Sequence, residues 1–309
     1  MKKIFIDGKA GTTGLRIEER LSQREDIEIV TIPEELRKDP QAKKEILNSV
    51  DVAFLCLPDQ AAIESVSLIE NENVVVIDTS TAHRTNPAWA YGFPELDSEL
   101  EEKIKSSKRI AVPGCHASGF IALVYPLIKN GFISPDTMLS ATSLTGYSGG
   151  GKKMIADYEA EELDCLLNGP RQYALSQKHK HLPEMIKVTG LKNEPVFCPI
   201  VGTFYSGMEV TVPLFKSQLL KGGIEEIRQL YKSTYNTKIV HYAENADESG
   251  FLSAVALEGK DSMQIEVYGN EDRILLVARY DNLGKGASGA AVECLNIVLG
   301  QDKTKTLEL

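Results

Sequence analysis

The sequence predicts an α/β protein with a Rossmann-type doubly wound parallel sheet, followed by an α+β domain whose sheet is mostly antiparallel. Three observations carry this prediction. Short apolar runs alternate with helical patterns over the first third of the chain, a glycine-rich turn follows the first run, and strand-like runs dominate from residue 196 onward. The length of 309 residues is ample for two domains.

The first third of the chain alternates strand and helix. The expected strands are 4–7, 27–32, 52–57, 74–77 and 110–112, and the expected helices are 15–21, 42–47, 60–68 and 96–104. Short, continuously apolar strands joined by helices are typical of a parallel sheet that is covered on both faces. We therefore expect a nucleotide-binding domain here.

The rest of the chain has a different character. Expected strands are 139–144, 196–204, 208–214, 238–242, 263–268 and 274–280, with helices at 224–235 and 287–299. The last two strands flank Gly269-Asn270, a turn signal for an antiparallel hairpin. The polar tail 301–309 is expected to fray. We place the domain boundary at Cys115, so that this residue lies between the domains, where ligand sites are common.

Composition and charge favour small molecules as ligands over nucleic acid or membranes. Hydrophobic residues make up 42% of the chain and charged residues 25%, and the net charge of −10 comes without a basic stripe for nucleic acid. The start of the chain turns polar too early for a signal peptide, and no apolar run reaches the length of a membrane span. We expect a cytoplasmic protein that binds small molecules but neither nucleic acid nor membrane, and whose strand-rich second domain forms a dimer or tetramer.

A glycine-rich turn follows the first expected strand. Gly8, Gly11 and Gly14 are spaced three apart, and Thr12 and Thr13 lie between the last two. Glycines at such a turn let backbone N–H groups approach a pyrophosphate at the start of the next helix. The spacing differs from the more familiar Gly-x-Gly-x-x-Gly, but its position after a strand favours a dinucleotide site.

The type of nicotinamide cofactor depends on the residues after the second strand. An acid there binds an unphosphorylated ribose, whereas a basic residue binds a 2′-phosphate. Glu34 could take the first role, and Arg37 or Lys38 the second. The residue pattern leaves NAD and NADP both open.

Five scattered cysteines, without Cys-x-x-Cys spacing, indicate neither a disulfide framework nor a zinc site. Cys115 is the only one of the five that lies beside turn residues, because it follows Pro113 and Gly114 at the junction between a buried strand and a helix. A thiol there faces the positive end of a helix dipole, which lowers its pKa towards the nucleophilic thiolate. The alternative is a small buried hydrophobe, the usual fate of a cysteine outside disulfides.

Several motifs together resemble one family. In chain order they are Gly8–Gly14, Phe54–Pro58, Val76–Arg84, Tyr91–Glu95, Pro113–Cys115, Lys178–Glu184, Gly207–Leu214 and Asp281–Ala291. The chain resembles the N-acetyl-gamma-glutamyl-phosphate reductases of the arginine pathway, in particular their shorter form. The Pro-Gly-Cys and His-x-His-x-Pro-Glu motifs discriminate most.

The resemblance implies NADPH-dependent reduction of N-acetyl-L-glutamyl 5-phosphate to N-acetyl-L-glutamate 5-semialdehyde and phosphate. Cys115 would attack the acyl phosphate to form a thioester, which hydride then reduces. It further implies that residues 1–114 and 284–309 form the NADP-binding domain, with a returning C-terminal helix, and that residues 115–283 form the catalytic and oligomerisation domain. Ser80, Asn282 and Gly286 become cofactor contacts on the same grounds, although a helix-capping role would explain Asn282 and Gly286 equally well.

Two histidines are candidates for the general acid and base. His179 and His181 precede Pro183, which is expected to open a short helix. Histidine suits proton transfer because its ordinary pKa is about 6.5. Side chains two apart in an extended stretch point to opposite sides, so we expect only one to be catalytic and prefer His181. No compact ligand set for a metal is present, and His116 is expected to contribute backbone rather than imidazole.

The substrate carries two anionic groups, which need binding sites. Candidates are the glycine-rich loop 145–153, with Ser148, Gly149 and Lys152 as donors, and the side chains of Arg84 and Arg171. Successive glycines can aim backbone N–H groups at an anion. The family has serine where this chain has Thr145, and Arg84 could equally be a structural ion-pair partner.

The sequence leaves other functions open. Aspartate-semialdehyde dehydrogenases and aminoadipyl-phosphate reductases use the same cysteine chemistry on other acyl phosphates. The paired histidines and the Pro-Gly-Cys motif count against the first, whereas sequence reasoning does not exclude the second. A cofactor-independent Cys–His hydrolase or acyltransferase would not explain the glycine turn. A catalytically silent nucleotide sensor would not explain the cysteine and the histidines.

Overall fold

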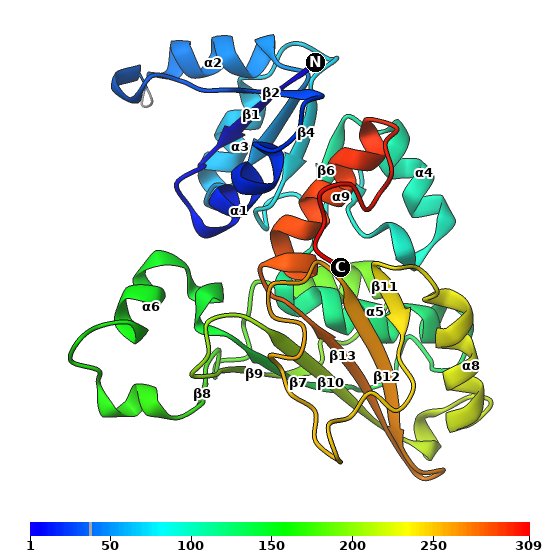
Figure 1. Ribbon diagram of the computed structural model, residues 1–309. Coiled ribbons are helices and arrows are strands. Elements are labelled where there is room, and N and C mark those ends of the chain that lie inside the picture. The colour runs from blue at the N-terminus through cyan, green and yellow to red at the C-terminus, as the bar shows by residue number, and fades with distance from the viewer. Residues whose placement is uncertain (37–38) are drawn as a thin grey trace. The chain divides into compact units, whose positions relative to one another are not determined.

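The computed structural model describes residues 1–36 and 39–309 and divides into two compact units. The first unit consists of Met1–Gly114 and Ala287–Leu307, and the second of Cys115–Gly286 and Glu308–Leu309 (Figure 1). The chain therefore passes from one unit to the other three times. Among the described residues, no helix is both long and apolar enough to cross a bilayer.

The first unit is built on a six-stranded sheet in the order β2-β1-β3-β4-β6-β5, in which every neighbouring pair is parallel. Its strands are β1 (Lys2–Asp7), β2 (Ile27–Val30), β3 (Val52–Leu55), β4 (Val75–Asp78), β5 (Ala90–Tyr91) and β6 (Arg109–Ala111). Its helices are α1 (Thr12–Leu21), α2 (Pro40–Ser49), α3 (Asp59–Ser67), α4 (Ser98–Ser106) and α9 (Gly289–Val298), with short 3-10 turns at Glu34–Leu36 and Pro94–Leu96. The predicted parallel sheet is confirmed.

Helices cover both faces of this sheet because the strands are apolar on both sides. Ile4 and Ile6 of β1 belong to one buried cluster, which also contains residues of α1, α4 and α9. Phe5, between them, belongs to a second cluster with residues of α2 and α3. Alternate side chains of a strand point to opposite faces, so one strand contributes to both cores. This arrangement confirms the doubly wound plan.

The second unit is built on a seven-stranded mixed sheet in the order β11-β12-β13-β10-β7-β9-β8. Its strands are β7 (Ser140–Thr145), β8 (Arg171–Gln172), β9 (Val196–Val201), β10 (Met208–Phe215), β11 (Val240–Tyr242), β12 (Met263–Gly269) and β13 (Arg273–Tyr280). Its helices are α5 (Cys115–Lys129), α6 (Gly151–Tyr158), α7 (Leu182–Thr189) and α8 (Ile224–Thr234). Short 3-10 turns lie at Tyr147–Gly150, Cys165–Asn168 and Lys216–Gln218, and a π-helical turn lies at Gly284–Ser288. Four neighbouring pairs are antiparallel and two are parallel, which confirms a mostly antiparallel sheet.

The long helix α5 packs on β10 and β13 and is itself flanked by α7 and α8. Pro126 lies inside α5 and has no N–H, so the carbonyl of Ala122 lacks its usual donor four residues on. The hydroxyl of Tyr235 donates to that carbonyl at 2.6 Å, and Tyr231 donates to the next one, of Leu123, at 2.5 Å. Two tyrosines therefore satisfy the backbone of α5 around its proline.

The C-terminal tail is ordered, so the expectation that it frays is wrong. The side-chain amide of Asn296 donates to the carbonyls of Lys303 and Lys305. At the end of the chain, the N–H of Asp261 donates to Glu308 O at 2.6 Å, and the Glu308 N–H donates back to the Asp261 carboxylate. These bonds hold backbone groups of the tail, which a composition-based argument does not anticipate.

Candidate active site

The glycine-rich turn leads from β1 into α1. Gly8 has a φ of +82°, and a Cβ placed there would lie 2.3 Å from the carbonyl oxygen of Cys56. A Cβ on Gly14 would lie 2.7 Å from both Gly8 O and the Cα of Lys9. Both positions therefore require glycine, whereas a Cβ on Gly11 would come no closer than 3.4 Å to another atom. Thr12 and Thr13 form the first positions of α1, beside its N-terminal N–H groups.

A cavity of about 370 Å³ opens beside this turn. Its wall includes the turn itself, the residues that end and follow β2, and Lys43 of α2. Lys43 forms an ion pair with Asp7 at 2.7 Å. A tight turn at a helix N-terminus with a cavity towards the second strand is the arrangement in which dinucleotide-binding domains hold their ligand. Arg37 and Lys38 lie outside the described residues.

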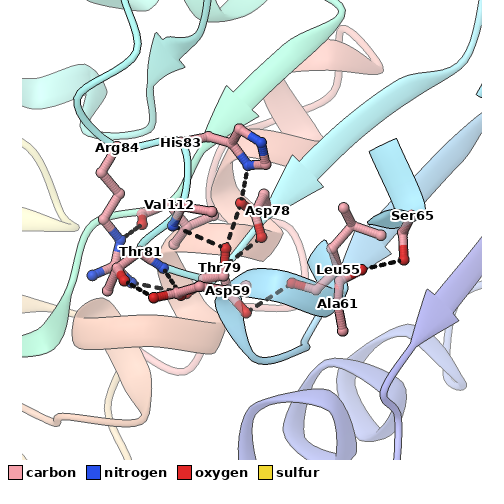
Figure 2. Close-up of polar contacts among 12 residues, drawn as sticks. Leu55, Asp59, Ala61, Ser65, Asp78, Thr79, Thr81, His83, Arg84 and Val112 are labelled. Carbon is pink, nitrogen blue, oxygen red and sulfur yellow. Dashed lines mark hydrogen bonds and ion pairs between the residues drawn. The ribbon is translucent and has the colours of Figure 1, made fainter. Parts of the chain in front are cut away.

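A second group of polar residues follows β4 in the same unit. Figure 2 shows Asp78 at the end of β4, with the buried side chains of His83 and Arg84 nearby. Asp78 accepts hydrogen bonds from the hydroxyl of Ser80 at 2.7 Å and pairs with His83 Nδ1 at 2.6 Å. The His83 ring also stacks on Trp89, with centroids 4.0 Å apart. His83 thus connects the segment after β4 to Asp78 by a hydrogen bond and to Trp89 by ring stacking.

Arg84 connects the ends of two strands. Its Nε donates to the carbonyl of Val112, just after β6, and its Nη2 donates to the carbonyl of Thr79, just after β4 (Figure 2). Charged donors make strong hydrogen bonds to carbonyls. One guanidinium nitrogen therefore holds the backbone three residues ahead of Cys115, and another holds the backbone just after β4.

Cys115 is the first residue of α5. A Cβ on Gly286 would lie 3.2 Å from the Cβ of Cys115, so the loop after β13 passes directly against the thiol-bearing residue. The hydroxyl of Tyr280, the last residue of β13, donates to the carbonyl of Cys115 at 2.5 Å. One segment, from the end of β13 to Gly286, thus lies against Cys115 although it follows that residue by 165 positions or more.

The two candidate histidines lie side by side. Their ring centroids are 4.7 Å apart, and His179 Nδ1 accepts a hydrogen bond from the backbone N–H of His181. The expectation that they point to opposite sides is wrong, because the chain turns at Lys180 and His181 has helical φ and ψ as the residue that precedes α7. The alternation rule holds only for extended backbone.

His116 joins this cluster through its imidazole, and not only through its backbone as expected. The buried ring is bonded to Ser143 Oγ at 2.7 Å and to Tyr173 Oη at 2.6 Å. It also lies 5.5 Å from the His179 ring and 5.7 Å from the His181 ring, between centroids. The residue after the cysteine therefore links the histidine pair to Tyr173.

Burial sets the protonation states in this cluster. It lowers the pKa of His116 to about 3, with a smaller contribution from His179, and it lowers that of His179 to about 4, assisted by the charge of Lys180. Burial also raises the pKa of Tyr173, and the charge of Cys115 raises it further. Around neutral pH, His116 and His179 are therefore neutral and Tyr173 keeps its proton.

The glycine-rich loop after β7 contains a second polar contact. Asn282 donates to Ser148 Oγ at 3.0 Å and accepts from the N–H of Gly207 at 2.9 Å, and Gly149 lies beside the Asn282 amide. This contact joins a predicted cofactor residue to two predicted substrate residues. The exposed Lys152 opens α6, and Arg171 bonds to the hydroxyl of Tyr158 and lies over its ring.

Sequence reasoning missed three residues around Cys115 and the histidine cluster. Tyr173 and Tyr280 carry no motif of their own, although Tyr280 directly precedes the glycine-rich Asp281–Gly286 segment. Glu184 is buried. The pKa of Tyr280 is raised mainly by burial, next by the charge of Cys115, and least by the charge of Glu184. The place of Glu184 in His-x-His-Leu-Pro-Glu was the one available signal. Within residues 1–36 and 39–309, no three His, Cys, Asp or Glu side chains are grouped as metal ligands.

Both halves of the chain match family models. Residues 11–105 match the semialdehyde dehydrogenase NAD binding domain, and residues 115–282 match the semialdehyde dehydrogenase dimerisation domain. Curated relatives align along almost the whole chain. N-acetyl-gamma-glutamyl-phosphate reductase 2 of a Nostoc species is 45% identical over 96% of this chain and 97% of its own. The corresponding reductase of Brucella ovis is 44% identical over 97% and 99%.

Solved structures show the same fold at low identity. Aspartate semialdehyde dehydrogenase II of Vibrio cholerae, complexed with ASA, has a TM-score of 0.73 and 16% identity over 97% of this chain and 98% of its own. Aspartate semialdehyde dehydrogenase of Candida albicans with NADP has a TM-score of 0.69 and 17% identity over 97% and 98%.

Proposed function

The chain belongs to the N-acetyl-gamma-glutamyl-phosphate reductase family within the semialdehyde dehydrogenases, and from this premise we propose that it reduces N-acetyl-L-glutamyl 5-phosphate with NADPH. The products would be N-acetyl-L-glutamate 5-semialdehyde and phosphate, in a step of arginine biosynthesis. The observation that carries the proposal is Cys115 at the start of α5, in one unit with the cluster of His116, His179 and Tyr173.

We propose that Cys115 is the nucleophile. Its thiolate attacks the acyl carbon of the substrate, the C–S bond forms, and the C–O bond to phosphate breaks with its electron pair leaving on phosphate. NADPH, when bound, would supply the hydride for reduction of the resulting thioester. A general acid gives a proton to the oxygen of the reduced carbon, which completes the thiohemiacetal on Cys115. The same group, now acting as a base, takes the hydroxyl proton back as the C–S bond breaks, which releases the aldehyde and restores the Cys115 thiolate.

His181 is the better candidate for this acid and base. An effective group has a pKa near the working pH, whereas the pKa of His179 is lowered to about 4. His179 instead accepts the backbone N–H of His181 and so helps to fix the turn that carries it. We therefore assign proton transfer to His181 and positioning to His179.

The glycine turn is our proposed pyrophosphate site, with Gly8, Gly11 and Gly14 and the first turn of α1, including Thr12 and Thr13. The structure fits such a ligand because side chains at Gly8 or Gly14 would collide with backbone. For the rest of the cofactor we retain Ser80, Asn282 and Gly286, and for its 2′-phosphate Arg37 and Lys38. Lys43 lies on the cavity wall and is a further positively charged candidate for binding the 2′-phosphate.

Replacement of Gly14 tests the cofactor site. In Gly14→Ala the new Cβ, 2.7 Å from two backbone atoms, forces the turn to shift, so we expect the Kd for NADPH to rise at least about tenfold. Gly169→Ala is the matched control, because nothing lies within 4 Å of its added Cβ. Fluorescence titration with NADPH measures both variants, and an unchanged Kd for Gly14→Ala contradicts the assignment.

For the anionic groups of the substrate we propose the loop after β7, with Ser148, Gly149 and Lys152, and Arg171 as a further cation. The Asn282 contact that orders Ser148 supports this choice. Arg84 has less support as a direct ligand, since its Nε and Nη2 already bind carbonyls.

We propose a homo-oligomer, either a dimer or a tetramer, whose contact uses the face of the mixed sheet opposite α5. Val212 and Leu214 of β10 are buried, whereas Pro213 and Phe215 between and after them are exposed. Leu275 of β13 pairs with Pro213 and is also exposed. Apolar side chains on an uncovered sheet face, within the part that matches a dimerisation domain, support this interface.

A cytoplasmic location is also part of the proposal. All five cysteines lie in described residues, and none forms a disulfide. A nucleophilic thiol is maintained most readily in a reducing compartment.

A substrate comparison tests the function itself. We expect phosphate-dependent oxidation of N-acetylglutamate semialdehyde with NADP to exceed that of aspartate or aminoadipate semialdehyde at least about 10²-fold in kcat/KM, because a site built for one substrate leaves polar groups unpaired with the others. The same assay with NAD measures cofactor preference. Equal rates on the three aldehydes would contradict the proposed substrate.

A further inference from the structure

The hydroxyl of Tyr280 bridges the first turn of α5. It donates to the carbonyl of Cys115 at 2.5 Å and accepts from the N–H of Gly119 at 3.0 Å. These two groups are four residues apart and are the pair that an α-helix joins directly. A side-chain hydroxyl placed against such a pair alters the local path of the helix. The altered turn is the one that begins with Cys115.

The approach of Tyr280 is built into the sequence at Gly119. A Cβ at this position would lie 2.7 Å from the Tyr280 hydroxyl and 2.7 Å from a methyl group of Val210. Gly119 has no positive φ to explain it, so the close approach of the tyrosine ring explains the glycine. A larger residue would force Tyr280, Val210 or the helix itself to shift.

Tyr280 is also a permanent donor. It is fully buried at the end of β13. Burial raises its pKa well above the usual value, and the charge of Cys115 raises it further. Its phenol therefore keeps its proton around neutral pH and can donate to the Cys115 carbonyl.

We propose that Tyr280 is a positioning residue for the nucleophile: by bridging the Cys115 carbonyl and the Gly119 N–H, its hydroxyl sets the place of the thiol at the start of α5. The inference rests on the proposed role of Cys115. Tyr280 acts through the backbone and does not itself touch the substrate. Its loop continues to Gly286, where an added Cβ would lie 3.2 Å from the Cys115 Cβ, so the segment after β13 contacts the nucleophile at two places.

Tyr235 offers a matched control on the same helix. Its hydroxyl is buried and donates to the carbonyl of Ala122, two turns after Cys115. Tyr280→Phe and Tyr235→Phe each remove one buried hydroxyl that donates to a carbonyl of α5. In Tyr280→Phe the carbonyl that loses its donor belongs to the first turn of α5, whereas in Tyr235→Phe it lies two turns later.

The experiment measures Cys115 without substrate. Tyr280→Phe and Tyr235→Phe are treated with iodoacetamide across a pH series, and alkylation of the Cys115 peptide is followed by mass spectrometry. We expect the rate at Cys115 to fall about tenfold in Tyr280→Phe and to stay within about twofold in Tyr235→Phe. In the enzyme assay, kcat should fall about 10-fold to 10²-fold in Tyr280→Phe with an unchanged KM and an unchanged Kd for NADPH.

Two results overturn the proposal. One is a Tyr280→Phe variant with the parent's Cys115 alkylation rate and kcat, and the other is an equal loss in Tyr235→Phe, which indicates general destabilisation of α5. Thermal unfolding of both variants identifies the second case. Because alkylation needs no turnover, it remains informative even if Cys115→Ser shows that the thiol is not the nucleophile, and the two failures are therefore distinguishable.

Discussion

Cys115→Ser is expected to lose at least about 10⁴-fold in kcat, because a serine hydroxyl at neutral pH does not replace a thiolate as nucleophile. The Kd for NADPH should change less than about twofold, since the proposed pyrophosphate site is formed by the turn between β1 and α1. Phosphate-dependent oxidation of N-acetylglutamate semialdehyde, followed by NADPH absorbance, gives the first quantity. Fluorescence titration gives the second.

Cys165→Ser is the control for this substitution. Cys165 is exposed and lies in a short 3-10 turn, so its loss should leave kcat within about twofold of the parent. Cys56 is less useful as a reactive reference, because burial raises its pKa to about 12. Turnover by Cys115→Ser within tenfold of the parent would exclude a covalent mechanism through this residue.

His181→Gln is expected to lower kcat by about 10² to 10⁴-fold, the range that a positioned general acid or base contributes. Glutamine keeps the approximate size and a hydrogen-bonding end, but it cannot accept and return a proton near neutral pH. The rate of the chemical step, measured in a single turnover with NADP and phosphate, reports the loss without interference from product release.

His179→Gln is the comparison that assigns the pair. With a pKa lowered to about 4, His179 is a weak base and lacks a proton to give at neutral pH, so we expect a loss below about tenfold. A larger effect at His179 than at His181 would reverse our assignment.

The sequence predicted the order of strands and helices well because these depend on local patterns. Ile4, Phe5 and Ile6 are apolar in succession, which indicates a strand buried on both faces, and both clusters are present. The first strand-to-helix turn could be read from Gly8 and Gly14, whose backbone requires glycine.

The detail of the cluster could not be predicted, because it depends on contacts between distant segments. Tyr280 reaches Cys115 across 165 positions and Tyr173 reaches His116 across 57, and neither contact leaves a local pattern. The histidine pair was misjudged because a single turn at Lys180 brings together rings that an extended chain would separate. The relative direction of two side chains that are two positions apart depends on the backbone φ and ψ angles between them, and the residue types alone do not determine these angles.

The first unit is assembled from two distant parts of the chain, which has a consequence for its biosynthesis. Residues of α9, near the end of the chain, are buried in the same cluster as those of β1, α1 and α4. A ribosome that has released only residues 1–114 has therefore produced a sheet with one apolar face incompletely covered. The continuous segment 115–286 emerges complete before this face can close. We expect the second unit to fold first during translation, while the first, although begun earlier, waits for its last helix and depends on chaperones in the interval.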